Sequence, residues 1–300
     1  MKNIFYLIIV TMLLCTSCSS ETANLNEDTT INNSELLYQI SYFNDSISKT
    51  KVTTRSRSGK ILYWMSVISA DCSGAYTGGC IGLKCGALVG QPHIGAAIGA
   101  VVAGGWASYR VHRVLTRAAI IDKPLTPIKV AGALVAAKEQ NIDISKNYSK
   151  EIILPLSDSK NEIKAIGAKH NIVLRNLIDD KIDTINLEKS LTKEEFEIIN
   201  SEQFKQDCEK AINKIQNSFN DNIVQETENR TISDKLMSLF YSICQTYPDN
   251  SEDVQFIINK YIEAVKNTNE ISEQDKPVIY QAISVAASSY EFWMNEGNIN

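Results

Sequence analysis

Glycine recurs every four residues through an apolar stretch of the chain, and this spacing restricts the fold more than any other feature. The first run contains Gly74, Gly78, Gly82, Gly86 and Gly90, and the spacing resumes at Gly95 and Gly99. Residues four apart lie on nearly the same face of a helix, so each run leaves a groove without side chains. Each glycine costs a helix about 0.5–1 kcal/mol relative to alanine, so close packing against a second backbone must compensate. The pattern predicts two close-packed antiparallel helices that turn at Gly90–His93.

The surroundings of these glycines leave three arrangements open. Residues 61–109 contain only two charged side chains, Asp71 and Lys84. Pro92 and His93 interrupt the uncharged stretch, and the unbroken part, Ile94–Tyr109, is shorter than the roughly 20 residues that a membrane-spanning helix needs. The hairpin packs on the rest of the protein, contacts or enters a membrane through residues 61–109, or is a mobile segment.

The glycine-rich stretch is similar to two known classes of segment. The residues that carry the similarity are Ser73-Gly74-Ala75, Gly78-Gly79, Gly95-Ala96-Ala97-Ile98-Gly99-Ala100 and Gly104-Gly105. They resemble the glycine-zipper two-helix segment of outer-membrane lipoproteins, and also the glycine-rich bacteriocin-like peptides that permeabilise membranes. The first resemblance implies helix pairing, and the second implies a membrane-active effector or toxin.

The N-terminus has the layout of a lipoprotein signal peptide. Lys2 precedes an apolar run from Ile4 to Leu14, and two small residues then lead to Cys18. The run is too short to span a membrane, which is typical of a secretory signal. We expect residues 1–17 to be removed and Cys18 to carry the acyl chains, palmitate among them, since two or three chains give stable anchoring. Cys15 stands where leucine is commonest in such signals, and it is the fallback site.

The remaining chain is predicted to be all-α. Residues 18–58 are polar and are expected to form a tether, apart from a short helix at Glu35–Tyr42. Residues 59–120 are expected to form the glycine-zipper hairpin, and residues 121–300 a helical bundle. Thr126 before Pro127 predicts one helix start, and Thr192 with Glu195 predicts a capping box. The later segments keep the 3.6-residue period of amphipathic helices, with residues 141–158 as a loop.

Two stretches of this bundle resemble a group of uncharacterised helical lipoproteins from Bacteroides-type bacteria. The first is Gly167-Ala-Lys-His170-Asn171-Ile-Val-Leu174, which is similar to the G-x-x-H-N-x-x-L motif of that group. The second is the closing helix from Ile283 to Trp293, which is similar to its terminal A-x-x-S-x-x-x-W pattern. The resemblance implies a fold and an outer-membrane address, and no biochemical role.

Few residues are candidates for chemistry. His170 lies on an apolar helix face beside Asn171, and we interpret the two as a polar core in which the histidine bonds across the bundle. No second histidine stands at metal-ligand spacing, so neither a metal nor a cofactor is expected. Cys208 and Cys244 lie on apolar faces of adjacent helices, either as a disulfide or as two buried thiols. The cysteines at positions 72, 80 and 85 are interpreted as tolerated small residues.

The composition restricts the classes of function. The net charge of −5 gives no sign of nucleic-acid binding. The chain lacks the G-x-S-x-G, H-E-x-x-H and phosphate-loop motifs, which makes an enzyme the least favoured class. We therefore expect a lipid-anchored interaction protein of the cell envelope, held at the outer membrane and binding an unknown protein partner. The alternative is the bacteriocin-like effector.

Overall fold

The structure is a computed structural model, and it describes residues 34–51, 59–115, 125–139, 142–144, 149–157, 161–221, 231–248 and 250–296. Within these ranges the chain is helical with connecting loops and no strand, so the predicted all-α class is confirmed. The chain divides into two compact units, Met1–Glu35 and Leu36–Asn300, and the second contains the apolar core.

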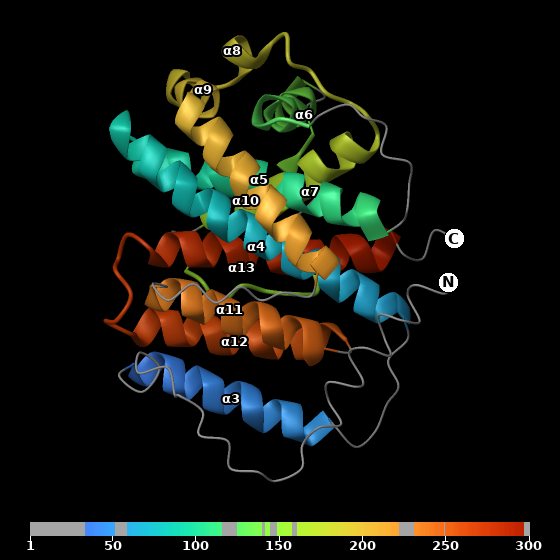
Figure 1. Ribbon diagram of the computed structural model, residues 1–300, viewed down its shortest axis with the longest axis vertical. Coiled ribbons are helices and arrows are strands. Elements are labelled where there is room, and N and C mark those ends of the chain that lie inside the picture. Colours follow the sequence, from blue (N-terminus) through green and yellow to red (C-terminus); the bar gives the residue numbers. More distant parts are fainter. Residues whose placement is uncertain are drawn as a thin grey trace. The chain divides into compact units, whose positions relative to one another are not determined.

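The helices of this unit are shown in Figure 1. They are α3 (Glu35–Lys51), α4 (Gly59–Leu88), α5 (Pro92–Leu115), α6 (Pro127–Glu139), α7 (Asn161–Ile178), α8 (Leu187–Ser190), α9 (Lys193–Asn200), α10 (Glu202–Asp221), α11 (Ile232–Thr246), α12 (Ser251–Asn267) and α13 (Lys276–Glu296).

The pair α4 and α5 forms the centre of this unit. Helices α13, α7, α10 and α11 pack around the pair (Figure 1). Helix α12 packs on α13 and on α11. Because the central pair is covered on several sides, its residues contribute to the same apolar cluster as those of the surrounding helices.

The glycines of α4 and α5 bring the two backbones into direct contact. A Cβ atom added at Gly82 would lie 1.9 Å from the carbonyl oxygen of Gly95, and one at Gly78 would lie 2.3 Å from that of Gly99. The contacts run in opposite directions along the two helices, which are therefore antiparallel. Gly74 continues the series, since its added Cβ would lie 2.7 Å from the carbonyl oxygen of Ala103. At these points only glycine permits the observed separation.

Gly90 differs from the other glycines of the series. It lies in the turn between α4 and α5 with φ of +75°, and an added Cβ would meet nothing within 4 Å. The expectation that Gly90 packs two helices together is therefore corrected. Its nitrogen donates to the carbonyl of Ala87, and Gln91 nitrogen donates to that of Gly86. This is the left-handed C-terminal cap in which glycine carries no steric cost.

Other glycines of the hairpin face neighbouring helices. A Cβ at Gly79 would lie 2.7 Å from the Val278 side chain on α13, and one at Gly105 would lie 2.8 Å from Val173 on α7. The hairpin is thus packed both internally and against the rest of the unit. Among the described residues, no helix combines the length and the apolar character that crossing a membrane requires.

The divisions expected from the sequence differ from those in the structure. The sequence predicts residues 59–120 and 121–300 as separate parts, yet their described residues share one apolar core. Helix α3 extends to Lys51, and it buries Leu37 and Ile40 completely. Asn44 on the same helix donates to Tyr261 Oη across 2.9 Å. Residues 36–51 therefore belong to the helical unit and not to a polar tether, because their apolar side chains repeat with the helical period.

Local capping signals in the bundle are found where the sequence predicts them. The capping box at Thr192 and Glu195 is confirmed, with each residue's side chain accepting the other's backbone N–H. Lys129 nitrogen donates to Thr126 Oγ1 across 3.4 Å at the start of α6. The described part of the predicted 141–158 loop is bonded to α13 through Glu291, whose Oε1 accepts the backbone N–H of Ile152 across 3.2 Å.

Candidate functional site

A cluster of buried polar side chains lies where α4, α5, α7 and α13 meet. Asp71 on α4 is completely buried, and its Oδ2 accepts a hydrogen bond from Trp293 Nε1 across 3.1 Å. Ser289 Oγ, one turn earlier on α13, donates to the same oxygen. Ser108 on α5 is also buried and places a hydroxyl near this carboxyl.

The environment of Asp71 favours its neutral form. Burial raises the pKa of Asp71 above its ordinary value, because a charged carboxylate in the core loses its hydration. The nearby imidazole of His170 and the hydroxyl and indole groups of Ser108, Ser289 and Trp293 oppose this rise without cancelling it. Asp71 Oδ1 has no hydrogen-bond partner among the described residues. A proton on the carboxyl would remove the cost of an unpaired buried charge.

His170 and Asn171, the predicted polar core, lie in this region. His170 is completely buried, and its Nδ1 is 3.1 Å from Asn171 Oδ1. Asn171 Nδ2 donates to the carbonyl of Ser288 on α13 across 2.8 Å. That bond orients the amide, so Asn171 Oδ1 is the acceptor and Nδ1 of the imidazole carries the hydrogen. His170 Nε2 has no partner among the described residues.

Glycine makes room for this cluster. Gly104 on α5 lies against the imidazole, and a Cβ there would be 3.2 Å from His170 Cδ2. Gly167 on α7 lies against α13, and a Cβ there would be 2.3 Å from the carbonyl oxygen of Ser284. Gly167 nitrogen donates to Ser284 Oγ across 3.3 Å. The glycine three residues before His170 therefore sets the approach of α7 to α13.

The cluster joins helices and does not open to a ligand. A carboxyl, an imidazole and serine hydroxyls are the groups used in nucleophilic catalysis, but here Asp71, His170, Ser108 and Ser289 are all completely buried. None of them lines the surface hollow beside Ile185 or the one beside Phe256. In this geometry the cluster can hold a proton and fix four helices. Within the described part of the chain, these four side chains are shielded from solvent.

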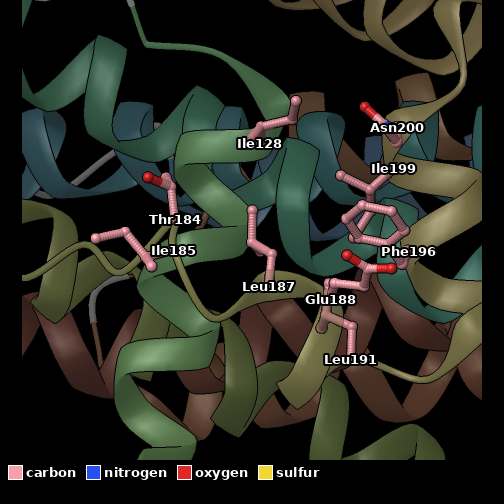
Figure 2. A pocket seen from close by; sticks show the side chains of 9 residues that line it. All are labelled: Ile128, Thr184, Ile185, Leu187, Glu188, Leu191, Phe196, Ile199 and Asn200. Atoms are coloured by element: carbon pink, nitrogen blue, oxygen red, sulfur yellow. The ribbon is translucent and has the colours of Figure 1, made fainter.

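A surface hollow of about 270 Å³ lies between α6, α8 and α9. Figure 2 shows its side chains, which are mainly aliphatic or aromatic. They are Ile128, Thr184, Ile185, Leu187, Glu188, Leu191, Phe196, Ile199 and Asn200. Ile185 is 91% exposed, an unusual position for a large aliphatic residue. The hollow therefore offers an apolar surface with a polar edge, of the kind that a partner's side chain can cover.

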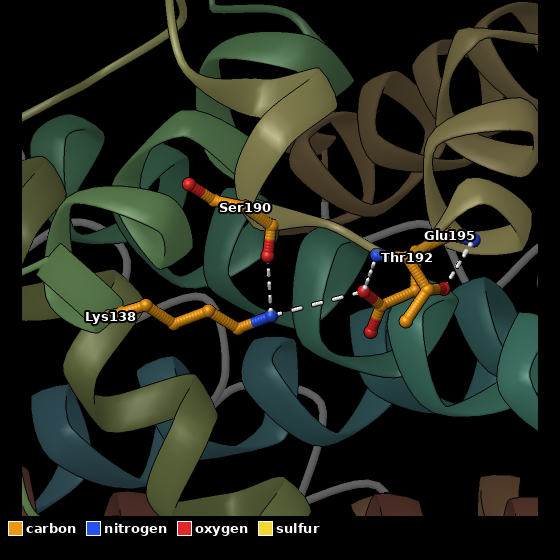
Figure 3. A network of polar contacts seen from close by, with 4 residues as sticks. All are labelled: Lys138, Ser190, Thr192 and Glu195. Carbon is orange, nitrogen blue, oxygen red and sulfur yellow. Dashed lines mark hydrogen bonds and ion pairs between the residues drawn. The ribbon is translucent and has the colours of Figure 1, made fainter.

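One lysine ties the walls of this hollow together. Lys138 at the end of α6 donates to the carbonyl of Ser190 across 3.1 Å, and its Nζ lies 3.8 Å from Glu195 Oε2. Glu195 also accepts from Thr192 nitrogen across 2.9 Å (Figure 3). The contacts link α6 to the C-terminus of α8 and to the N-terminus of α9. They fix the geometry of the hollow without using its lining residues.

The structure resolves the alternative left open for the cysteines. All five cysteines in the described ranges are free thiols, including Cys208 and Cys244. Cys72 donates to the carbonyl of Ala282 across 3.2 Å. Burial raises the pKa of Cys80 to about 11, and it raises the pKa of Cys208 and Cys244 as well. Four of the five thiols are buried in the interior, and Cys80 is half-buried.

The remaining predicted sites divide into two groups. Cys18, the expected lipidation site, lies outside the described residues. The helix-packing glycines of α4 and α5 line a helix contact, and no ligand site is formed by them. Within the described residues no group of three or more potential metal ligands occurs. The sequence patterns do not single out Asp71 as a site residue, although an isolated acidic residue within an apolar stretch is a usable signal.

Comparison with known proteins adds no family assignment. No protein-family model, no curated protein and no solved structure matches the chain. The resemblance to helical lipoproteins of Bacteroides-type bacteria therefore stays a prediction that rests on the two quoted motifs.

Proposed function

We propose that the chain is a lipid-anchored protein of the bacterial outer membrane, and that its helical unit binds a protein partner. The observation that carries the proposal is the N-terminal sequence, in which an apolar run and two small residues lead directly to Cys18. Acyl chains on the thiol and on the freed amine of Cys18 would anchor the protein stably.

The described unit supports binding in preference to chemistry. Its titratable core residues, Asp71 and His170, are covered by four helices. Its surface, in contrast, exposes an apolar hollow with Ile185 at the edge. We assign partner binding to this hollow, because covering an exposed aliphatic side chain and its neighbours removes apolar area from water.

A membrane-active effector is the second candidate, and the glycine pattern favours it. In the structure, however, Gly78 and Gly82 contact the backbone of α5, while Gly79 contacts α13. Insertion into a membrane would require the hairpin to break these contacts. The surrounding helices would then lose the central pair on which they pack. Dye release from anionic liposomes by the Cys18→Ser mature chain tests this candidate. Leakage under conditions that keep the helical unit folded would favour the membrane-active effector over the anchored binding protein.

Metabolic labelling with an alkyne fatty acid tests the anchor. We expect the wild-type chain and a Cys15→Ser control to take up the label and to fractionate with the outer membrane. The Cys18→Ser variant should lose the label. Label that persists in Cys18→Ser and disappears in Cys15→Ser would assign the lipid to Cys15. An unlabelled wild-type chain would overturn the proposal.

A further inference from the structure

The tip of the α4–α5 hairpin exposes two adjacent aliphatic side chains. Leu88 is 82% exposed and Val89 is 37% exposed. The backbone beneath them is ordered by hydrogen bonds: Gly90 nitrogen donates to Ala87 oxygen across 3.2 Å, and Gln91 nitrogen donates to Gly86 oxygen across 2.7 Å. The aliphatic side chains are therefore presented by a fixed turn.

The hairpin itself has no acidic residue close to this tip. Between Asp71 and Asp122 the sequence has no acidic residue. Lys84, one turn before Leu88, is exposed, and so is His93 just beyond the turn. Burial, together with the carboxylate of Asp207 on α10, raises the pKa of Cys85, which lies behind the tip on α4. An aliphatic tip with a lysine one turn away suits the headgroup region of a membrane with anionic lipids.

The remainder of the hairpin is not available for such contact. Gly78, Gly82 and Gly95 are engaged between the two helices, and other hairpin residues pack on α13 and α7. Of the residues 61–109 over which the sequence predicts membrane contact, this packing leaves those of the turn available. Fifteen residues, 19–33, lie between Cys18 and the first described residue, and an extended chain of that length could span at most about 50 Å.

We propose that the hairpin tip, residues 87–93, contacts the headgroup region of the membrane in which the lipid on Cys18 is embedded. This inference rests on the proposed lipid anchor. Two aliphatic side chains bind a membrane weakly by themselves, but an anchor that confines the protein to the surface greatly raises their effective concentration. The tip would then orient the helical unit relative to the membrane.

Fluorescence quenching by brominated lipids tests the contact. The acylated mature chain is placed in anionic vesicles, with a tryptophan introduced by Leu88→Trp, and the signal of the parent chain is subtracted. Ile185→Trp is the matched control, because it also replaces an exposed aliphatic residue but lies outside the hairpin. Tyr42→Trp, on the exposed face of α3, tests a second surface that carries exposed large side chains.

We expect lipids brominated near the headgroup to quench the added fluorescence of Leu88→Trp, and to leave that of Ile185→Trp and Tyr42→Trp unchanged. Adding Lys84→Glu to Leu88→Trp should reduce the quenching in anionic vesicles. Quenching at Tyr42→Trp alone, or at none of the three positions, would overturn the inference. Each protein is first shown by mass spectrometry to carry the acyl chains. A chain without acylation contradicts the proposed anchor, whereas an acylated chain with an unquenched tip contradicts only this inference.

Discussion

Trp293 on the last helix donates its indole N–H to Oδ2 of Asp71, a residue 222 positions earlier, across 3.1 Å. Ser289 donates to the same oxygen. Because the carboxyl and both donors are buried, water cannot replace either bond if one partner is removed. This contact therefore fixes α13 to the middle of α4, next to the close approach of α4 and α5.

The first prediction concerns the charge of Asp71. Burial raises its pKa in the folded state above the unfolded value of about 3.8, so the folded protein holds the proton more tightly. Its contribution to stability is complete below pH 3.8 and is lost as the pH rises through the folded pKa. Asp71→Asn, which cannot ionise, should therefore gain stability over the wild type across that range, by up to about 1.4 kcal/mol per pH unit. Urea denaturation at several pH values measures the difference.

The control for this prediction is Asp71→Leu, which removes the hydrogen-bond acceptor as well as the charge, whereas Asp71→Asn removes only the charge. Asparagine keeps an oxygen for Ser289 and Trp293, and its amino group replaces Oδ1, which has no partner among the described residues. Asp71→Leu leaves both donors without an acceptor and should destabilise the fold by about 1–3 kcal/mol for each unsatisfied group. A stability difference between Asp71→Asn and the wild type that does not change with pH would contradict the assignment.

The second prediction separates two roles of glycine. Gly82→Ala should destabilise the protein by about 1–3 kcal/mol, because the new Cβ would lie 1.9 Å from the Gly95 oxygen and must push α4 from α5. This loss exceeds the gain of about 1 kcal/mol that alanine brings to a helix. Gly90→Asn should cost less than about 1 kcal/mol, since asparagine tolerates the left-handed conformation and the turn is open.

Thermal unfolding compares these variants under one set of conditions. Gly90→Val serves as the control for conformation, because a β-branched residue is strongly disfavoured at positive φ. Equal stability of Gly82→Ala and the wild type would show that α4 and α5 do not approach as closely as the structure has them.

The sequence is most informative where structure depends on neighbours along the chain. The capping box at Thr192 depends on residues three apart, and the glycine spacing predicts a close approach that Gly78 and Gly82 make in the structure. The expectation for Gly90 is wrong because periodicity alone cannot distinguish a helical glycine from a left-handed cap. The burial of α3 exceeds the sequence expectation because polar surroundings obscure its apolar face.

Long-range contacts explain the features that the sequence does not determine. The pattern around His170 predicts a core residue, but nothing near it in the sequence points to Asp71 or Trp293. The hollow near Ile185 is built from α6, α8 and α9, and its shape depends on how these helices pack. Such sites need the tertiary arrangement, because their members are brought together by packing and not by spacing.

The third prediction tests partner binding at the hollow. A photo-crosslinking amino acid at Ile185 should give a crosslinked product of defined mass in cells that display the protein. The same group at Tyr38, which is 60% exposed on α3, is the control. An additional Thr184→Asp substitution should reduce the Ile185 product, because Thr184 is an exposed lining residue and a charge in the hollow opposes apolar contact. Equal crosslinking at Ile185 and Tyr38, unaffected by Thr184→Asp, would contradict the assignment of partner binding to this surface.

The fourth prediction concerns the thiols. Thiolate is the form that reacts with disulfide reagents, and burial raises the pKa of Cys80 to about 11 and the pKa of Cys85 above its ordinary value. The folded Cys18→Ser mature chain should therefore react slowly with Ellman's reagent at about pH 8, half a unit below the ordinary thiol pKa. The rate should rise as the pH approaches 11, with Cys80 reacting first because it is only partly buried and the other four are buried.

Unfolding provides the matched measurement for the same chain. In urea without reductant, all five thiols should react, because Cys208 and Cys244 are free in the structure. A count of three would mean that one pair is oxidised, and peptide mapping would show whether that pair is Cys208–Cys244. Cys80→Ser should remove the first phase in the folded protein and leave the slower phases unchanged, since the buried thiols become accessible only when helices separate. Rapid reaction of all thiols in the folded protein would contradict the packing of α4 against α10 and α11.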